Sequence, residues 1–311
     1  MARPLVVAAA QLGPIQRSDS RATVVERLVA LLHRAAERGV QLVVFPELAL
    51  TTFFPRWYLE DPAEIDAFFE TEIPGPVTAP LFAAAARRGV GFHLGYAELA
   101  EEGGQRRRYN TAITVAPEGR VVGKYRKVHL PGHADHQPWR PFQHLEKYYF
   151  DVGDLGFPAF RAFGGVLGML ICNDRRWPEA YRMLGLQGVE LIMIGYNTPI
   201  YQADLPAVNQ LQGFHNHLCL QAGAYQNATW VVATAKAGVE EGCELLGQSA
   251  IIAPTGEIVA LAHTLGDELI SYEVNLDACR GLKETVFNFA VHRQPQHYHL
   301  ITGRQGAEPP P

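Results

Sequence analysis

The sequence lacks the features that mark several classes of protein. Its 311 residues include four cysteines, none in a C-x-x-C pair, which argues against zinc ribbons and thioredoxin-type redox sites. No apolar run approaches the about 20 residues of a membrane-spanning helix, so we expect no membrane partner. The net charge is −5, and the largest basic run, three arginines at 106–108, lies close to two glutamates. We interpret this run as a solvated loop and expect no nucleic-acid partner.

Linker-like segments are also absent before the C-terminal GAEPPP. With 48% hydrophobic residues the chain has enough apolar side chains for a large core, and we expect a single domain over residues 1–311. The first apolar stretch, LVVAAA, runs directly into Gln11 and Gly13. It predicts a core strand rather than a secretion signal, and a cytoplasmic location is therefore expected.

Segments with the periodicity of helices and strands alternate along the chain. Apolar spacing predicts helices over residues 21–38, 79–88 and 207–227, and Pro178 is placed to begin another. Strands are predicted at residues 5–10, 41–45, 91–97, 109–115, 120–125, 166–171, 189–194, 230–235, 248–253, 258–262 and 269–274. This alternation, with hairpins late in the chain, predicts an α/β fold with a mixed sheet.

Polar residues that catalysis uses follow the ends of certain predicted strands, where α/β folds gather reactive groups. Glu47 follows the strand VVF and has Phe45, Leu48 and Phe53 close by in the sequence. A carboxylate desolvated by such neighbours is a good proton acceptor. The alternative is a helix-capping or salt-bridged glutamate.

Basic residues crowd the strand that leads into HLPG. By alternation Tyr125, Lys127 and His129 share one face, and Lys124 and Arg126 share the other. A lysine beside a tyrosine and a histidine suggests an inward-facing cation. A solvated edge strand is the alternative.

Cys172 ends the apolar strand VLGMLI, and Asn173 and Asp174 begin a turn toward a helix. Such a strand-to-helix elbow presents a nucleophile, and the following backbone N–H groups can hold an oxyanion. A buried structural thiol is the alternative, and it is our interpretation for the three other cysteines, Cys219 in a helix, Cys243 in a loop and Cys279 on a polar segment. Together Glu47, Lys127 and Cys172 supply base, cation and nucleophile for acyl transfer.

The segments FPELALT, GKYRKVHLPG and GMLICNDRRWPE, in this order, resemble the Glu, Lys and Cys signature segments of the carbon–nitrogen hydrolase (nitrilase-like) family. RPFQHLEKYYFDVGDLGFP, GYNTP and FNFAVHRQPQHY resemble the branch of that family that acts on N-carbamoyl-D-amino acids. The resemblance covers about residues 6–299, except that residues 200–210 match no pattern of the branch. Side-chain preference among D-amino acids therefore stays open.

This resemblance implies a four-layer αββα sandwich that binds neither a metal nor an organic cofactor. It implies a homo-oligomer, a dimer or a tetramer, with residues of about 280–311 in the contacts. The implied reaction is hydrolysis of the ureido C–N bond of an N-carbamoyl-D-amino acid through a covalent cysteine intermediate, giving D-amino acid, CO2 and ammonia.

The resemblance also assigns roles to residues. It implies Glu47 as general base, Lys127 as the cation at the oxyanion, Cys172 as nucleophile and Glu146 as a second glutamate near the site. Whether Glu146 transfers a proton or only positions Lys127 is open. The residues expected to bind substrate are Asn173, Arg175, Arg176, His129, His144, Asn197 and Thr198.

Arg175 and Arg176 follow Cys172 by three and four residues, close to where the substrate carboxylate must lie. An arginine fork suits a carboxylate, so we expect both to face the pocket. Pairing with Asp174 or Glu179 on the surface is the alternative for at least one of them.

Other classes of protein could carry some of the same residues. Another amidase or a nitrilase would use the same three residues, and a catalytically dead binding protein would not need them intact. A papain-like protease would pair Cys172 with a histidine, but the chain order does not fit that family. Histidines such as His133 and His215 have no H-E-x-x-H or comparable spacing, so no metal is expected.

Overall fold

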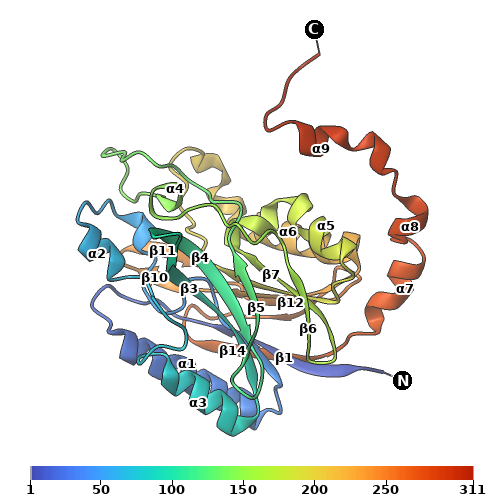
Figure 1. Cartoon of the computed structure of the whole chain (residues 1–311), viewed down its shortest axis with the longest axis horizontal. Helices are drawn as coiled ribbons and strands as arrows, with labels where there is room; N and C mark the ends of the chain where they lie inside the picture. Colours follow the sequence, from blue (N-terminus) through green and yellow to red (C-terminus); the bar gives the residue numbers. More distant parts are fainter. Residues whose placement is uncertain (1, 311) are drawn as a thin grey trace.

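The computed structural model describes residues 2–310 and consists of two mixed β-sheets packed face to face, each covered by helices on its outer side (Figure 1). The first six-stranded sheet has the order β14 (Glu268–Asn275), β1 (Pro4–Gln11), β2 (Leu42–Val44), β3 (Gly91–Glu102), β4 (Gln105–Val115) and β5 (Val121–Arg126). The second has the order β13 (Ile258–Leu261), β12 (Ala250–Ile252), β9 (Trp230–Ala235), β8 (Leu191–Tyr196), β7 (Gly165–Ile171) and β6 (Ala159–Ala162). The expected αββα sandwich is thereby confirmed.

Amphipathic helices cover the two sheets from outside. The apolar face of α1 (Arg21–Glu37) and that of α3 (Ala79–Arg88) pack on the first sheet, and Ser20 caps α1 through Thr23 N. On the second sheet lie α5 (Pro178–Leu186), which begins at its proline, and α6 (Gln212–Asn227). No helix within residues 2–310 combines the length and apolarity that crossing a bilayer requires.

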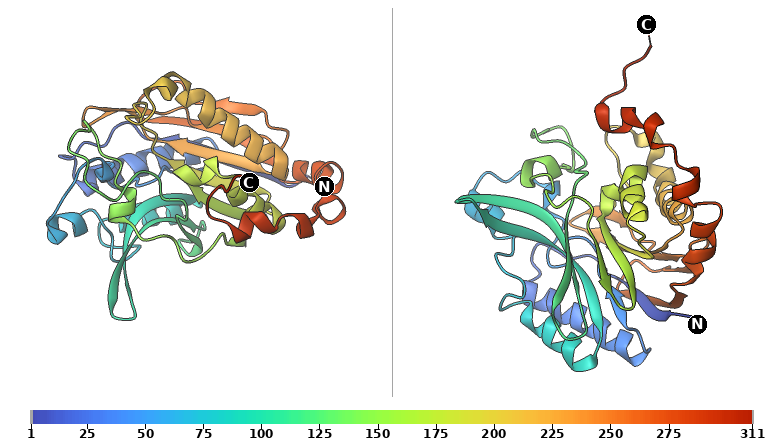
Figure 2. Two further views of the ribbon diagram at one scale, coloured as in Figure 1. Left: turned by 90° about the horizontal axis from the view of Figure 1, so that it is seen from above. Right: turned by 45° about the vertical axis from the view of Figure 1, so that its right-hand side comes forward.

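Shorter elements complete the chain. The short helices are α2 (Pro62–Asp66), α4 (Glu146–Tyr149), α7 (Ala278–Glu284), α8 (Phe289–His292) and α9 (His299–Gly303), with 3-10 turns η1 (Phe54–Arg56), η2 (Cys172–Arg176), η3 (Pro206–Leu211) and η4 (Pro295–His297). A small hairpin joins β10 (Ala237–Glu240) to β11 (Cys243–Leu246). The segment from α7 to α9 runs along the outside of the sandwich beside α5 (Figure 2).

The predicted elements are confirmed in most places, with three corrections. The arginines at 106–108 lie in β4 rather than in a loop, because β3 and β4 continue as a long hairpin arm. Their charges are paired with Asp66 and Asp151. The predicted helix over residues 207–227 begins as the 3-10 turn η3. Cys243 lies in β11 and is buried, whereas a loop was expected.

Strand direction explains why polar strand ends meet in one place. The parallel strands β7, β8 and β9 end at the same edge of the second sheet, and β2 runs parallel to β1 and β3 in the first. Glu47 follows β2, Lys127 follows β5 and Cys172 follows β7. The packing of the two sheets brings these three residues together between them.

Candidate active site

Glu47 lies in a fully buried polar pocket. One carboxylate oxygen, Oε1, accepts from Lys127 Nζ at 2.7 Å and from Asn110 Nδ2 at 2.8 Å. The other, Oε2, accepts from the backbone N–H of Asn197 at 3.0 Å. The apolar neighbours expected from the sequence are therefore only part of its surroundings, and its oxygens are held by donors from both sheets.

Two glycines let the strands approach the backbone of Glu47. A Cβ atom on Gly95 of β3 would lie 2.6 Å from Pro46 O, and one on Gly195 of β8 would lie 2.5 Å from Glu47 N. Real side chains do not tolerate such contacts with backbone atoms. Glycine at these two positions therefore lets a strand of each sheet pack against the backbone at Glu47.

Lys127 lies between two carboxylates. Its ammonium is 2.7 Å from Glu47 Oε1 and 2.6 Å from Glu146 Oε2, and all three side chains are buried. Burial alone would lower the pKa of Lys127, but the charges of Glu146 and Glu47 raise the pKa above its ordinary value. The lysine is therefore charged, and two of its three N–H donors are used.

Cys172 ends β7 at a sharp turn. Its backbone has a φ of 46°, the left-handed region that residues with side chains rarely adopt, and its thiol lies 3.2 Å from the carbonyl oxygen of Asn197. Burial and the nearby charge of Glu47 raise the pKa of Cys172, while Lys127 and Arg175 oppose that shift. The thiol is neutral near pH 7 and needs a base to react.

Asp174 holds the turn at Cys172 from inside and was not predicted from the sequence as a site residue. Its carboxylate accepts from Ile171 N at 2.9 Å and from the Tyr125 hydroxyl at 2.7 Å. It also accepts from His129 N at 3.0 Å and lies 2.8 Å from His129 Nδ1. His129 is thus tied to the turn and is not on the cavity wall, contrary to the expectation that it lines the pocket.

Arg175 is buried behind the turn at Cys172. Its guanidinium donates to Cys172 O at 2.6 Å, to Asn216 Oδ1 at 2.9 Å and to Thr198 Oγ1 at 2.7 Å, and it lies over the ring of Tyr196. These contacts use the fork that was expected to hold substrate. The expectation that both arginines face the pocket is therefore wrong for Arg175.

A cavity of about 690 Å³ opens beside the turn that begins at Cys172. Three of the expected substrate-binding residues lie on its wall: His144, Asn173 and Arg176. Asn197 and Thr198 do not, because Asn197 bonds Glu47 and Thr198 bonds Arg175. The wall also includes residues that were not predicted to bind substrate: Phe53, Arg56, Gln137, Arg140, Phe142, Tyr201, Asp204, Leu205, Val208, Gln212 and Cys243.

Glu146 connects the site to the cavity wall. Its Oε2 binds Lys127, and its Oε1 lies 3.5 Å from Nε2 of His144, which lines the cavity. Burial would raise the pKa of Glu146, but Lys127 and His144 hold the pKa below its ordinary value. An ionised Glu146 that binds Lys127 favours a positioning role. Within residues 2–310, no cluster of His, Cys, Asp or Glu is arranged to hold a metal ion.

The comparisons with known proteins agree with this geometry. The family model of carbon–nitrogen hydrolases matches residues 6–284. A nitrilase of Pyrococcus abyssi is 29% identical over 295 residues, covering 94% of this chain and 98% of its own length. The N-carbamoylputrescine amidase of Arabidopsis thaliana is 27% identical over 319 residues, with 98% and 97% covered.

Solved structures share the fold. A carbon–nitrogen hydrolase from Helicobacter pylori G27 superimposes with a TM-score of 0.82 at 25% identity, covering 97% of this chain and 99% of that one. Nit3 of Saccharomyces cerevisiae superimposes with a TM-score of 0.74 at 20% identity, covering 94% and 97%. Because the family match spans most of the chain, the protein belongs to the carbon–nitrogen hydrolase family and hydrolyses carbon–nitrogen bonds of amides.

Proposed function

We propose that the enzyme hydrolyses N-carbamoyl amino acids, with Cys172 as nucleophile, and releases ammonia, CO2 and the free amino acid. The observation that carries this proposal is Arg176, an exposed side chain on the cavity wall four residues after the nucleophile. The preference for the D form rests on the sequence resemblance to that branch of the family.

The charges around the cavity support an anionic substrate. Arg56 is paired with Glu240 and Arg140 with Asp204, whereas Arg176 takes part in no ion pair among the described residues. Asp204 is the single carboxylate among the described residues that line the cavity. A carboxylate one carbon from the ureido nitrogen would meet the fork of Arg176 while its carbonyl carbon lies at Cys172.

The first half of the reaction forms a covalent intermediate. Glu47 accepts the thiol proton as the sulfur of Cys172 attacks the ureido carbonyl, a weak electrophile because two nitrogens donate into it. The third N–H of Lys127 and the backbone N–H of Asn173 hold the oxyanion, and each such donor is worth roughly a hundred- to a thousandfold in rate. Glu47 returns its proton to the departing nitrogen, so that ammonia leaves and a thiocarbamate ester remains on the sulfur.

The second half releases the product. Glu47 takes a proton from water, whose oxygen attacks the thiocarbamate carbon and breaks the C–S bond. The proton then passes to the sulfur and restores the thiol. The product is an N-carboxy amino acid, which loses CO2 to give the free amino acid.

N-carbamoylputrescine is the second candidate substrate, because amidases named for it are 27% identical to this chain. It carries the same ureido group and the same Cys172 chemistry would serve. Its ammonium, however, would enter a cavity whose wall includes Arg56, Arg140 and Arg176. The charge of the wall therefore favours the amino acid.

Ammonia release by the purified protein tests the proposal. N-carbamoyl-D-phenylglycine, its L enantiomer, N-carbamoylputrescine and an aromatic nitrile are compared at equal concentrations. The D compound is expected to be hydrolysed fastest. Faster turnover of N-carbamoylputrescine or of the nitrile would overturn the proposed substrate and leave the family assignment intact.

A homo-oligomer and a cytoplasmic location also belong to this proposal. Support for the oligomer comes from apolar side chains that are exposed on α5 and the C-terminal segment, among them Met183, Leu186, Val286 and Ile301. Light scattering of the purified protein tests it, and a monomer at micromolar concentration would contradict it.

A further inference from the structure

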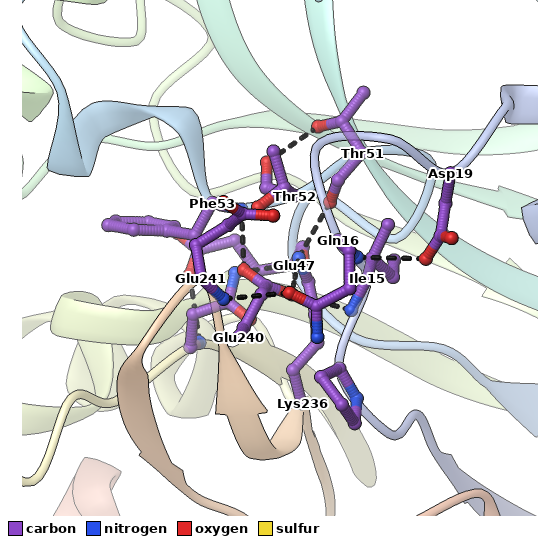
Figure 3. A network of polar contacts seen from close by, with 12 residues as sticks. Ile15, Gln16, Asp19, Glu47, Thr51, Thr52, Phe53, Lys236, Glu240 and Glu241 are labelled. Atoms are coloured by element: carbon purple, nitrogen blue, oxygen red, sulfur yellow. Dashed lines mark hydrogen bonds and ion pairs between the residues drawn. The ribbon is translucent and has the colours of Figure 1, made fainter.

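A second group of buried charges lies beyond Glu47, outside the residues that the proposed mechanism uses. Arg56, Lys236 and Glu240, called here the Glu240 network, are 3%, 0% and 0% exposed. Lys236, Glu240 and Glu47 are labelled in Figure 3. Lys236 follows β9, Glu240 ends β10 and Arg56 ends the turn η1. Charges removed from water are costly to the folded state unless each is paired, so the partners of these three side chains matter.

The carboxylate of Glu240 is fully occupied by donors. Its Oε1 accepts from Arg56 Nη2 at 2.5 Å and from Phe53 N at 2.7 Å. Its Oε2 accepts from Ile15 N at 2.9 Å and from Lys236 Nζ at 3.2 Å. Four donors from three parts of the chain therefore converge on one side chain.

The network holds the segment that continues from Glu47. Lys236 donates to Thr51 O at 2.6 Å, Glu240 accepts from Phe53 N, and Arg56 donates to Phe53 O at 2.9 Å. This segment turns sharply just after Glu47, where Leu48 has a φ of 46°. The network therefore anchors the far end of a short segment whose near end is the proposed general base.

The backbone of Lys236 is fixed on the other side of Glu47. Its N–H donates to Tyr196 O at 3.1 Å, one residue before Asn197, whose N–H binds the Glu47 carboxylate at 3.0 Å. Lys236 therefore contacts two segments beside Glu47. Its side chain binds Thr51, which follows Glu47, and its backbone binds Tyr196, which precedes Asn197.

The two buried groups have complementary charges. Lys127 between Glu47 and Glu146 leaves one negative charge in excess, and Arg56 with Lys236 against Glu240 leaves one positive charge in excess. Burial lowers the pKa of Lys236, and the charges of Glu240 and, more weakly, of Glu47 oppose that shift. The Glu240 network therefore places a positive charge close to the Glu47 group.

We propose that Lys236, held by Glu240, is a positioning residue of the active site: it fixes the segment that carries Glu47 and places a positive charge close to that carboxylate. The inference deepens the proposed function, since it assumes Glu47 as the base. The charged or titratable groups near Glu47 are Lys127 after β5, Glu146 in α4 with His144 beside it, Cys172 and Arg175 in η2, and Lys236 after β9.

Two variants that change the network charge in opposite directions test the proposal. Lys236→Met removes a positive charge, so the acid limb of the kcat/KM profile should move to higher pH by about half to one unit. Glu240→Gln removes a negative charge, so the acid limb should move to lower pH. Both variants should lower kcat by about tenfold or more with KM nearly unchanged, because the base is misplaced.

Lys283→Met is the matched control. Lys283 also donates to backbone carbonyls, Val189 O at 2.6 Å and Gly188 O at 3.1 Å, but it lies in α7 on the outside of the sandwich. Its pH profile and kcat should equal those of the wild type.

The same pH series is run on alkylation of Cys172 by iodoacetamide, which requires no assumption about the substrate. If the wild type does not hydrolyse the ureido substrate, the proposed function fails, and the alkylation profiles still decide the inference. Wild-type profiles in both variants, with only the melting temperature lowered, would overturn it. Failure of both variants to fold would also overturn it, because the network would then be a requirement of folding alone.

Discussion

The guanidinium of Arg175 donates to the carbonyl oxygen of Cys172 at 2.6 Å and so holds this residue, the proposed nucleophile, in its left-handed backbone conformation. The adjacent Arg176 lies on the cavity wall instead. Two neighbouring arginines therefore have separable functions in the proposed enzyme. Arg175 supports the turn at Cys172, and in the proposed function Arg176 binds the substrate carboxylate.

Substitution of these arginines should separate the two functions. Arg176→Ala should raise KM for N-carbamoyl-D-phenylglycine by roughly tenfold to a hundredfold, the range expected for a lost hydrogen bond to a charged group, and spare a neutral amide. Arg175→Lys should lower kcat for both substrates, because lysine cannot reproduce the three contacts of the fork. Steady-state kinetics on the two substrates measure this. Equal losses on both substrates in Arg176→Ala would show that Arg176 binds no carboxylate.

Glu47 and Lys127 should act on one transition state. Glu47→Gln should lower kcat by about a hundredfold or more, since general base catalysis is worth that much. Lys127→Met should be similarly slow and also less stable, because Glu47 and Glu146 would remain buried without a cation at a cost of about 3–5 kcal/mol.

The double variant decides whether these residues are coupled. It should be about as slow as the slower single variant. A rate equal to the product of the two single effects would show that Glu47 and Lys127 act independently. Thermal melts of all three variants separate loss of activity from loss of folded protein.

Much of the site could be predicted because its signals are local. Glu47 and Cys172 each follow an apolar strand, and Lys127 follows a strand crowded with basic residues. By contrast, Asn110 lies within the apolar part of β4, and the strand order β2-β3-β4 of the first sheet brings its side chain to Glu47 at 2.8 Å. The one feature of the sequence that pointed to Asn110 was an amide side chain at an inward-facing position of a buried strand.

Other features depend on contacts that sequence spacing does not determine. Arg175 and Arg176 are adjacent, yet the 3-10 turn η2 directs one inward and one to the cavity. Glu240 lies on a short hairpin that no periodicity marked, and Lys236 lies just before it, so the Glu240 network was missed. The hairpin arm of β3 and β4 was predicted too short because its outer residues are polar and read as a loop.

Gly195 should be required for activity more than for folding. An added Cβ would lie 2.5 Å from Glu47 N, so Gly195→Ala should displace Glu47 and lower kcat by roughly a hundredfold, the effect expected for a misplaced catalytic group. Gly281→Ala in α7 is the control, because nothing lies within 4 Å of its added Cβ. Kinetics and thermal melts of both variants check this. Wild-type kcat in Gly195→Ala would mean that the strands move apart without disturbing the base.

Stability should fall in mild acid because of His93. This histidine is buried in β3, and burial lowers the pKa of His93 to about 4. In the unfolded chain a histidine binds a proton at a pKa of about 6.5, above the pKa of His93 in the folded protein. The contribution of His93 to the free energy of unfolding, roughly 3 kcal/mol, is therefore complete above pH 6.5 and is lost as the pH falls toward 4. Denaturant melts between pH 7 and 4 should show a weaker acid loss in His93→Gln and no change in the exposed control His263→Gln. Identical pH slopes in all three proteins would exclude His93 as the cause.

The covalent step through Cys172 is tested most directly by intact-protein mass spectrometry of enzyme quenched in acid during turnover of N-carbamoyl-D-phenylglycine. The predicted result is an adduct whose mass equals the substrate minus ammonia, located on the peptide that contains Cys172. The Cys172→Ala variant should be folded, should bind substrate and should show neither the adduct nor ammonia release. An adduct on another residue, or ammonia release near the wild-type rate by Cys172→Ala, would contradict the assignment of Cys172 as the nucleophile.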